Sequence, residues 1–235
     1  MTLQHDQGLA DSLDRLGALA PAKVDVHGLL DEVVGAVEAL FNLDGAGVML
    51  ADPEQALRTV MVTDERGASL ERAQESAGGG PCVDAYVYGR PTPCRDVHSD
   101  PRYTAVSERM SRSGVHAVLG VPIRLAGNPV GVLNLYVDTP HDWTEAQIAG
   151  LSAYAELLGR MLGVALAARR SDELAGQLQR ALDSRVVVER AIGYVMASHT
   201  LDANRAFQLI RAAARRSRTR VVDLAAIVLD TGRLP

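Results

Sequence analysis

Arginine is concentrated in the last third of the chain, and its spacing there points to a polyanionic partner. Residues 169–235 contain 12 Arg against 7 Asp and Glu, whereas residues 1–168 contain 12 Lys and Arg against 22 Asp and Glu. Arg211, Arg215 and Arg218 follow the i, i+4 and i+7 spacing that places side chains on one helical face. The planar guanidinium bonds phosphate with two parallel hydrogen bonds and stacks on bases, so this face suits RNA. A solvated helical face with no partner is the alternative.

Further candidates for contact with a nucleic acid surround this face. Arg216 and Arg220 border it, and Arg185 and Arg190 approach it from the preceding segment. Of the two aromatic rings in the region, Phe207 is expected in the core, and the other is a candidate for stacking on an unpaired base. The predicted RNA-binding set is therefore Arg185, Arg190, Arg211, Arg215, Arg216, Arg218, Arg220 and Tyr194. Binding to DNA is less favoured, because residues 220–230 offer few side chains suited to base edges.

The front of the chain holds fewer residues that could do chemistry. Cys82, Cys94 and His116 are the candidates for sensing a ligand or a redox change. The spacing of the cysteines to nearby histidines matches no familiar zinc pattern, so no metal site is expected. Two small buried apolar side chains are the simpler interpretation of the cysteines, and a haem ligand is an alternative for His116. No catalytic residue and no cofactor follows from the sequence.

These front residues must be positioned by an α+β domain over residues 25–165. Apolar residues at helical spacing predict a helix from Asp25. Strands are expected at 45–51, 57–62, 91–97, 118–125 and 130–137, with a hairpin loop at 126–128. Helices are expected at 69–77 and 101–113, and residues 78–81 read as a break. The order predicts a mostly antiparallel sheet flanked by helices. Residues 1–24 form a leader that is either loose or a short helix.

A long helix is predicted to start at Thr144, where Gln147 completes a capping box. Its apolar seam continues from Leu151 through Leu174, Leu178 and Leu182, which predicts a coiled-coil connector over 166–180. Two ordinary helices with an exposed joint near 169–173 are the alternative.

Residues 181–235 are predicted to form a small three-helix module. Asp202 is expected to cap 203–216, Thr219 is expected to cap 220–230, and Gly232 is expected to end the last helix. A unit this small buries little apolar surface alone, so a second copy or the neighbouring domain must support it.

Residues 181–229 resemble the ANTAR family of transcription antitermination regulators. The matching residues are Arg185, Glu189, Ala191, Gly193, Met196, Ala206, Phe207, Leu209, Arg211, Ala214, Arg218, Asp223, Leu224 and Ala225. Ile192 and Arg220 stand where the family often has lysine, and Ile192 removes one expected phosphate contact. The resemblance implies a homodimer that binds paired hairpins in nascent leader RNA and prevents an overlapping terminator from forming.

Residues 25–165 resemble a GAF domain. The resemblance rests on 47–50, Gly80-Pro81-Cys82, 95–97, 100–103, 120–123, 131–135 and 143–145. It implies a sensor that responds to a small ligand or a redox change in a cup over the sheet, or a degenerate cup that serves as a dimer scaffold. Some GAF-like proteins reduce free methionine sulfoxide, so a thiol enzyme is an alternative, as is a sensor acting through protein partners. Because an enzyme leaves the basic tail unexplained, a non-enzymatic regulator is expected.

The remaining features concern location. The N-terminus lacks the basic start and apolar stretch of a secretion signal. The sequence has no long uncharged apolar run, and its two cysteines form no disulfide framework. These features predict a cytoplasmic protein with no membrane partner.

Overall fold

A five-stranded antiparallel sheet forms the centre of the N-terminal half. The computed structural model describes residues 2–18, 26–110, 113–168 and 173–234. Within the sheet the strand order is β2-β1-β5-β4-β3, and every neighbouring pair is antiparallel. The strands are β1 (Gly45–Ala51), β2 (Leu57–Val62), β3 (Thr92–Cys94), β4 (Ala117–Leu125) and β5 (Asn128–Val137). The predicted α+β domain with an antiparallel sheet is therefore confirmed.

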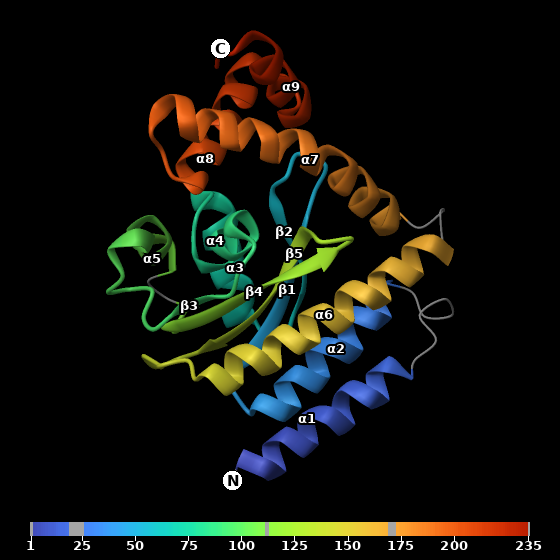
Figure 1. The fold of residues 1–235 in the computed structure, drawn as a ribbon. Helices are drawn as coiled ribbons and strands as arrows, with labels where there is room; N and C mark the ends of the chain where they lie inside the picture. Colours follow the sequence, from blue (N-terminus) through green and yellow to red (C-terminus); the bar gives the residue numbers. More distant parts are fainter. Residues whose placement is uncertain (1, 19–25, 111–112, 169–172, 235) are drawn as a thin grey trace.

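Three helices lie on one side of the sheet: α2 (Val26–Phe41) and α6 (Glu145–Ala168) cover its face, and α1 (Thr2–Gly17) packs on these two helices (Figure 1). Residues 2–17 thus form a helix, which is one of the two alternatives for the leader, and Ser12 and Tyr154 join it to α6 by a 2.7 Å hydrogen bond. Residues 145–167 of α6 are long and apolar enough to cross a membrane, but 56% of that stretch is buried. Packing against the sheet accounts for this apolar character. The capping box of Thr144 and Gln147 at its start is confirmed.

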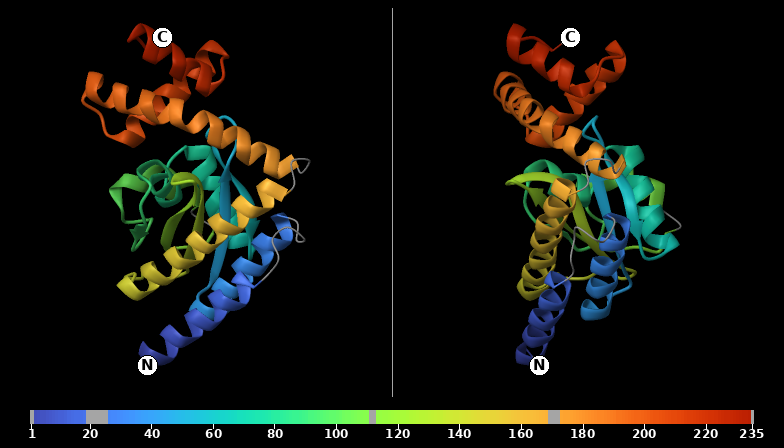
Figure 2. Two further views of the ribbon diagram at one scale, coloured as in Figure 1. Left: turned by 45° about the vertical axis from the view of Figure 1, so that its right-hand side comes forward. Right: turned by 90° about the vertical axis from the view of Figure 1, so that its right-hand side faces the viewer.

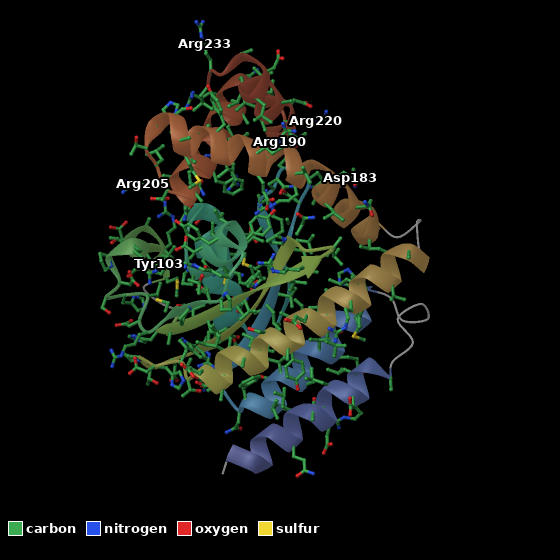
Figure 3. All side chains as sticks on the ribbon, viewed as in Figure 1. Tyr103, Asp183, Arg190, Arg205, Arg220 and Arg233 are labelled. Atoms are coloured by element: carbon green, nitrogen blue, oxygen red, sulfur yellow. The ribbon has the colours of Figure 1, made fainter. Side chains whose placement is uncertain are left out.

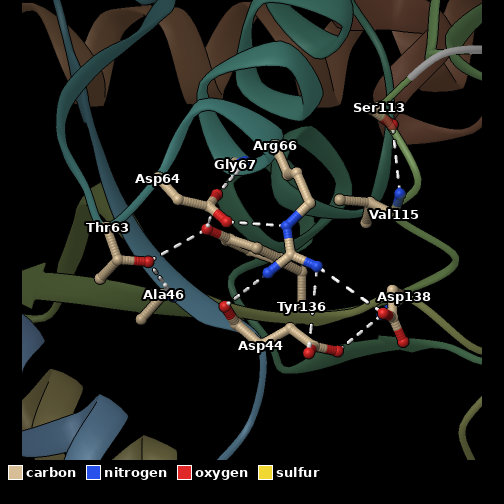
Figure 4. A network of polar contacts seen from close by, with 10 residues as sticks. All are labelled: Asp44, Ala46, Thr63, Asp64, Arg66, Gly67, Ser113, Val115, Tyr136 and Asp138. Atoms are coloured by element: carbon tan, nitrogen blue, oxygen red, sulfur yellow. Dashed lines mark hydrogen bonds and ion pairs between the residues drawn. The ribbon is translucent and has the colours of Figure 1, made fainter.

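Helices α3 (Glu65–Ala77) and α4 (Pro81–Tyr88) cover the opposite face, and the 3-10 turn η1 (Pro101–Tyr103) leads into α5 (Thr104–Met110), which packs on α3. A polar network fixes the start of α3 against the sheet (Figure 4). Asp64 caps α3 by accepting from the N–H of Gly67 at 2.8 Å, and its carboxylate also accepts from the hydroxyl of Tyr136 at 2.6 Å. Arg66 then pairs with Asp64 at 2.8 Å. The network holds α3 on β5.

Helix α4 was not expected, because residues 78–81 read only as a break. Gly80 precedes Pro81, which is the first residue of the helix. Proline is favoured at that position because its missing N–H would have no partner there in any case. That proline is the sequence signal that would have revealed α4.

Helices α7 (Glu173–His199), α8 (Ala203–Ser217) and α9 (Val221–Thr231) form the C-terminal module. Asp202 caps α8 by accepting from the N–H of Arg205 at 2.8 Å, and Gly232 ends α9, both as predicted. The predicted cap at Thr219 is wrong. The N–H of Thr219 closes α8 on the carbonyl of Ala214 at 3.0 Å, and its hydroxyl contacts Ser217. Helix α9 therefore starts one residue later than expected.

The connector between the two halves lies partly outside the described residues. Helix α6 ends at Ala168 and α7 begins at Glu173, so the exposed joint predicted near 169–173 falls mainly on residues that are not described. The side chains of Leu174 and Leu178 are not described either. Leu182 packs against the apolar cluster that the sheet shares with α2 and α6 of the same chain. The coiled coil stays a prediction.

The C-terminal module packs directly on the N-terminal half, α1 to α6, which is called the sensor half below, as the two views in Figure 2 show. Helix α7 crosses the end of the sheet beside the tip of the β1–β2 hairpin, and α8 lies against α4 (Figure 1). One apolar cluster runs from α4 and the sheet through Tyr86 to Phe207 and the inner faces of α7–α9. The neighbouring domain thus supplies the support that the small module needs.

Candidate nucleic-acid interface

The predicted RNA-binding residues divide into an exposed group and a group that faces the sensor half. Arg190, Arg215, Arg216, Arg218 and Arg220 are exposed. Arg190 and Arg220 point outward in Figure 3. Arg185 is buried, and Arg211 is half-buried. The sequence offered no means of separating these two groups.

The junction between α8 and α9 carries the densest exposed positive charge. Arg218 ends α8 in the left-handed conformation, with φ at +54°, where glycine is usual. The carboxylate of Asp223 accepts from both Nε and Nη2 of Arg220, at 2.7 Å and 2.8 Å. This hydrogen bonding raises the pKa of Arg220 and lowers the pKa of Asp223. A phosphate bound by Arg220 must compete with that carboxylate.

Two positions on α7, Ile192 and Tyr194, make packing contacts within the module. Ile192 is only 6% exposed and belongs to the apolar cluster, so packing accounts for an apolar residue where the family often has lysine. Tyr194 is 39% exposed, and its hydroxyl donates to the carbonyl of Gly232 at 3.0 Å. The ring therefore ties α7 to the end of α9 while one part of it stays open to solvent.

Arg185 is the most deeply placed of the predicted arginines, with 1% of its surface exposed. Its guanidinium lies 4.2 Å from the centre of the Tyr86 ring, which is a cation–π contact. Its Nε pairs with Glu189 at 2.7 Å, and its Nη2 donates to the carbonyl of Tyr86 at 3.3 Å. In this arrangement it joins α7 to α4, so contact with RNA would require α7 to leave α4.

One face of α8, which carries Asn204, Gln208 and Arg211, lies toward the sensor half. Nδ2 of Asn204 donates to Asp84 at 2.5 Å, and the amide of Gln208 donates to the carbonyl of Gly78. One turn further, the guanidinium of Arg211 lies 5.6 Å from the centre of the Phe207 ring. Burial, helped by the like charge of Arg215, lowers the pKa of Arg211.

The tip of the β1–β2 hairpin makes the second set of contacts between the halves. Nε2 of Gln55 donates to the carbonyl of Ala181 and to the hydroxyl of Ser184, each at 2.7 Å, while its Oε1 accepts from the hydroxyl of Tyr86 at 2.7 Å. The adjacent Glu54 accepts from the backbone N–H of Val221 at 2.9 Å. The sequence does not reveal the contacts of this tip with α7 and α9, because those partners lie more than a hundred residues away.

Beside the contact between α4 and α8, a cleft of about 760 Å³ opens between α8 and the part of the sensor half that includes η1. The glycines 78–80 and Tyr103 line it from the sensor half, and Arg205 and Arg215 line it from α8. Figure 3 shows Tyr103 and Arg205 on its two sides. The exposed α8 arginines therefore lie beside the boundary between the halves.

The candidate sensing residues lie on different elements of the sensor half, and the two cysteines share one buried apolar cluster. Cys82 lies on α4 and Cys94 on β3, and both are buried. Burial raises the pKa of the Cys82 thiol above its usual range and raises the pKa of the Cys94 thiol to about 12. Both stay protonated near neutral pH, and a thiol is a poor nucleophile compared with a thiolate. His116 is half-buried just before β4, where Nδ1 contacts Asp96 at 3.1 Å.

The described residues contain no group of three or more His, Cys, Asp and Glu side chains placed to hold a metal ion. The imidazole of His116 instead packs on that of His98, with ring centres 4.9 Å apart.

Comparisons with known proteins agree with this division of the chain. Residues 25–162 match the GAF domain family, and residues 176–229 match the ANTAR domain family. A comparison with curated protein sequences found no match.

Three solved structures are similar to the sensor half. The GAF domain of an Acinetobacter phosphoenolpyruvate-protein phosphotransferase is 17% identical, with a TM-score of 0.56 over 73% of this chain and 99% of that chain. The GAF domain of the Coxiella burnetii phosphoenolpyruvate-protein phosphotransferase is 18% identical, with a TM-score of 0.56 over 70% and 96%. Free methionine-R-sulfoxide reductase of Neisseria meningitidis is 17% identical, with a TM-score of 0.54 over 70% and 92%. At this identity the likeness shows the fold alone. The chain belongs to the GAF domain family and carries a C-terminal ANTAR domain.

Proposed function

We propose that this protein is a homodimeric antitermination regulator that binds paired hairpins in nascent leader RNA under the control of its GAF domain. An ANTAR domain implies an RNA-binding antitermination regulator, and a GAF domain indicates signal sensing. The observation that carries the proposal is the exposed cluster of Arg215, Arg216, Arg218 and Arg220 where α8 meets α9. Four cations within six residues present several guanidinium groups to the phosphates of a hairpin.

Paired hairpins call for two copies of the module, and its outer surface has features that suit a dimer. Val186 and Ile227 are apolar, and they are 52% and 42% exposed. Covering such side chains removes apolar surface from water, which favours association.

A regulator of this kind needs no catalytic residue. The buried, protonated thiols of Cys82 and Cys94 count against the alternative of a thiol enzyme. Nascent transcripts are found in the cytoplasm of bacteria, so the proposal places the protein there. The signal, the ligand of the GAF domain and the regulated transcripts are left open by the proposal.

The test starts from hairpin RNAs that the full chain enriches from a randomised pool. We expect Arg218→Gln combined with Arg220→Gln to weaken binding of the enriched RNA at least tenfold, because two phosphate contacts are lost. The slope of log affinity against log salt should fall by about 2, or about 1 for each contact. Fluorescence anisotropy over a range of salt concentrations measures both quantities.

The matched control is Arg72→Gln combined with Arg95→Gln, which removes the same charge from exposed positions of the sensor half. It should leave the salt slope unchanged. If no hairpin RNA is enriched over unstructured RNA, or if the control weakens binding equally, the proposal is wrong.

A further inference from the structure

Helix α9 begins without a local cap, and this leaves its first N–H groups without side-chain partners from its own segment. Its N-cap residue is Arg220, whose side chain makes no capping hydrogen bond. Arginine is not a residue that caps helices, because it has no acceptor. The start of α9 is therefore a positive site made of a helix N-terminus next to an exposed guanidinium.

A carboxylate of the sensor half occupies this site. Oε2 of Glu54 accepts from the N–H of Val221 at 2.9 Å, and its charge adds to the rise in the pKa of Arg220. A carboxylate that accepts from the N-terminus of a helix near an arginine takes a position that also suits a phosphate oxygen.

Further contacts hold the sensor half along α8. The buried carboxylate of Asp84 accepts from Asn204, and Asp52, which pairs with Arg58, lies close enough to Arg211 to oppose the fall in its pKa. Arg211 and Arg215, two of the predicted RNA contacts, thus lie on the same face of α8 as the residues that hold the sensor half. Arg185 also contacts the sensor half, since its guanidinium stacks on the ring of Tyr86.

We propose that the carboxylate of Glu54 imitates an RNA phosphate at the start of α9, and that Asp84 helps to hold α8 in place, so that the GAF domain and hairpin RNA compete for one face of the ANTAR domain. The inference rests on the proposed function and adds the way in which RNA binding is controlled. In the docked arrangement the protein keeps part of this face closed, namely Arg185, Arg211 and the N–H of Val221, while the arginines from 215 to 220 stay exposed. A signal that loosens the GAF domain from α8 and α9 releases this face.

The GAF domain and RNA compete because both would use the same atoms of the ANTAR domain. The N–H of Val221 donates to Glu54 in the docked state and is open to a phosphate only after that carboxylate leaves. Arg211 is half-buried against the sensor half, so it too reaches RNA only when the halves separate. Loss of the docking carboxylates should therefore increase RNA affinity, although neither residue touches RNA.

The experiment compares Glu54→Gln, and Glu54→Gln combined with Asp84→Asn, with the wild-type full chain. The probe is the hairpin RNA enriched by the wild-type protein. The matched controls are Glu38→Gln, and Glu38→Gln combined with Asp31→Asn, which remove the same charges from exposed positions of α2 on the opposite face. Spin labels on cysteines placed at the exposed positions Glu108 and Ala226 report the distance between the halves. Native Cys82 and Cys94 are buried and do not compete for the label.

We expect the docking variants to bind the RNA about tenfold more tightly, because a charged hydrogen bond and a helix-terminus contact no longer oppose opening. The controls should change affinity less than twofold. RNA should lengthen the distance between the labels in the wild-type protein. An RNA-bound protein with an unchanged distance would overturn the inference, as would a docking variant that opens without gaining affinity. Because the distance is measured with and without RNA, those outcomes leave the proposed function standing. Failure of every variant to bind hairpin RNA would end both proposals.

Discussion

Glu71 is a carboxyl group enclosed by the sensor half, and its chemistry differs from that of the surface acids. It is fully buried on α3, where Oε1 accepts from Nδ2 of Asn134 at 3.0 Å. Glycine at position 47 of β1 makes room for it, since a Cβ there would overlap Oε1. Oε2 of Glu71 and Oδ1 of Asn134 have no hydrogen-bond partner in the structure. A proton on the carboxyl supplies the missing donor.

Burial raises the pKa of Glu71 to about 8, although the hydrogen bond from Asn134 opposes the rise. An unfolded glutamate titrates near pH 4.3. Between these values the folded chain keeps a proton that the unfolded chain has lost, so the free energy of unfolding falls as pH rises from about 4.3 to about 8. Above that range this contribution is constant.

We predict that Glu71→Gln flattens this dependence, because a glutamine amide donates to Asn134 Oδ1 without titrating. Relative to the variant, the wild-type protein should lose at least about 1.4 kcal/mol between pH 5 and pH 8, the value of a single pKa unit. Urea unfolding at both pH values measures the difference. Equal pH dependence in the two proteins would show that Glu71 is ionised in the folded state.

Residue types and spacing were enough to locate the arginines at the end of the chain, but not to sort them. Arg185 and Arg220 look alike in the sequence, since both are cations at helical positions. In the structure Arg185 stacks on Tyr86 while Arg220 is exposed. The difference arises from a sensor-half residue 99 positions earlier, and local spacing carries no information about such a partner.

At the scale of elements, the sequence predicted the features that depend on neighbouring residues. Apolar spacing predicted the strands and α6, and the caps at Thr144 and Asp202 follow from side chains within their own turn. The start of α9 was misplaced because its capping acceptor, Glu54, comes from a hairpin tip in the other half of the chain. The same hairpin tip also carries Gln55, whose side chain joins the tip to α7.

The β1–β2 hairpin tip depends on one amide. Gln55 is fully buried and uses both ends of its side chain, with Tyr86 on α4 and with Ala181 and Ser184 on α7. We predict that Gln55→Ala lowers the free energy of unfolding by about 1–3 kcal/mol, because it leaves the buried hydroxyl of Tyr86 without a partner.

A double-mutant cycle separates this cost from simple loss of volume. Tyr86→Phe should destabilise the wild-type protein but have little effect, or a small stabilising one, in the Gln55→Ala background, since the orphaned hydroxyl is removed. Urea unfolding of the four proteins gives the coupling. Strictly additive costs would mean that the hydrogen bond between Gln55 and Tyr86 contributes nothing to the interface.

At the scale of the molecule, two halves of opposite charge share one apolar cluster. The front has an excess of acids and the tail an excess of arginines, and Glu54 of the hairpin tip accepts from the first N–H of α9. Each half was predictable by itself, because each buries its own periodic apolar faces. Their arrangement was not, since it depends on a few polar pairs such as Asp84 with Asn204 that no periodicity marks.

If the GAF domain closes the RNA-binding face, RNA binding should slow amide hydrogen exchange in some segments and speed it up in others. When hairpin RNA binds the wild-type full chain, amides of 216–224 should exchange more slowly because phosphates cover the junction of α8 and α9. Amides of 52–56 and 181–188 should exchange faster, since the hairpin tip loses Ala181 and Ser184 as partners. Exchange in α2, which lies on the far face of the sheet, should stay the same and serves as the internal reference. Slower exchange in 52–56 and 181–188 as well as in 216–224 would mean that RNA binds to the docked protein. The halves would then have to communicate without separating.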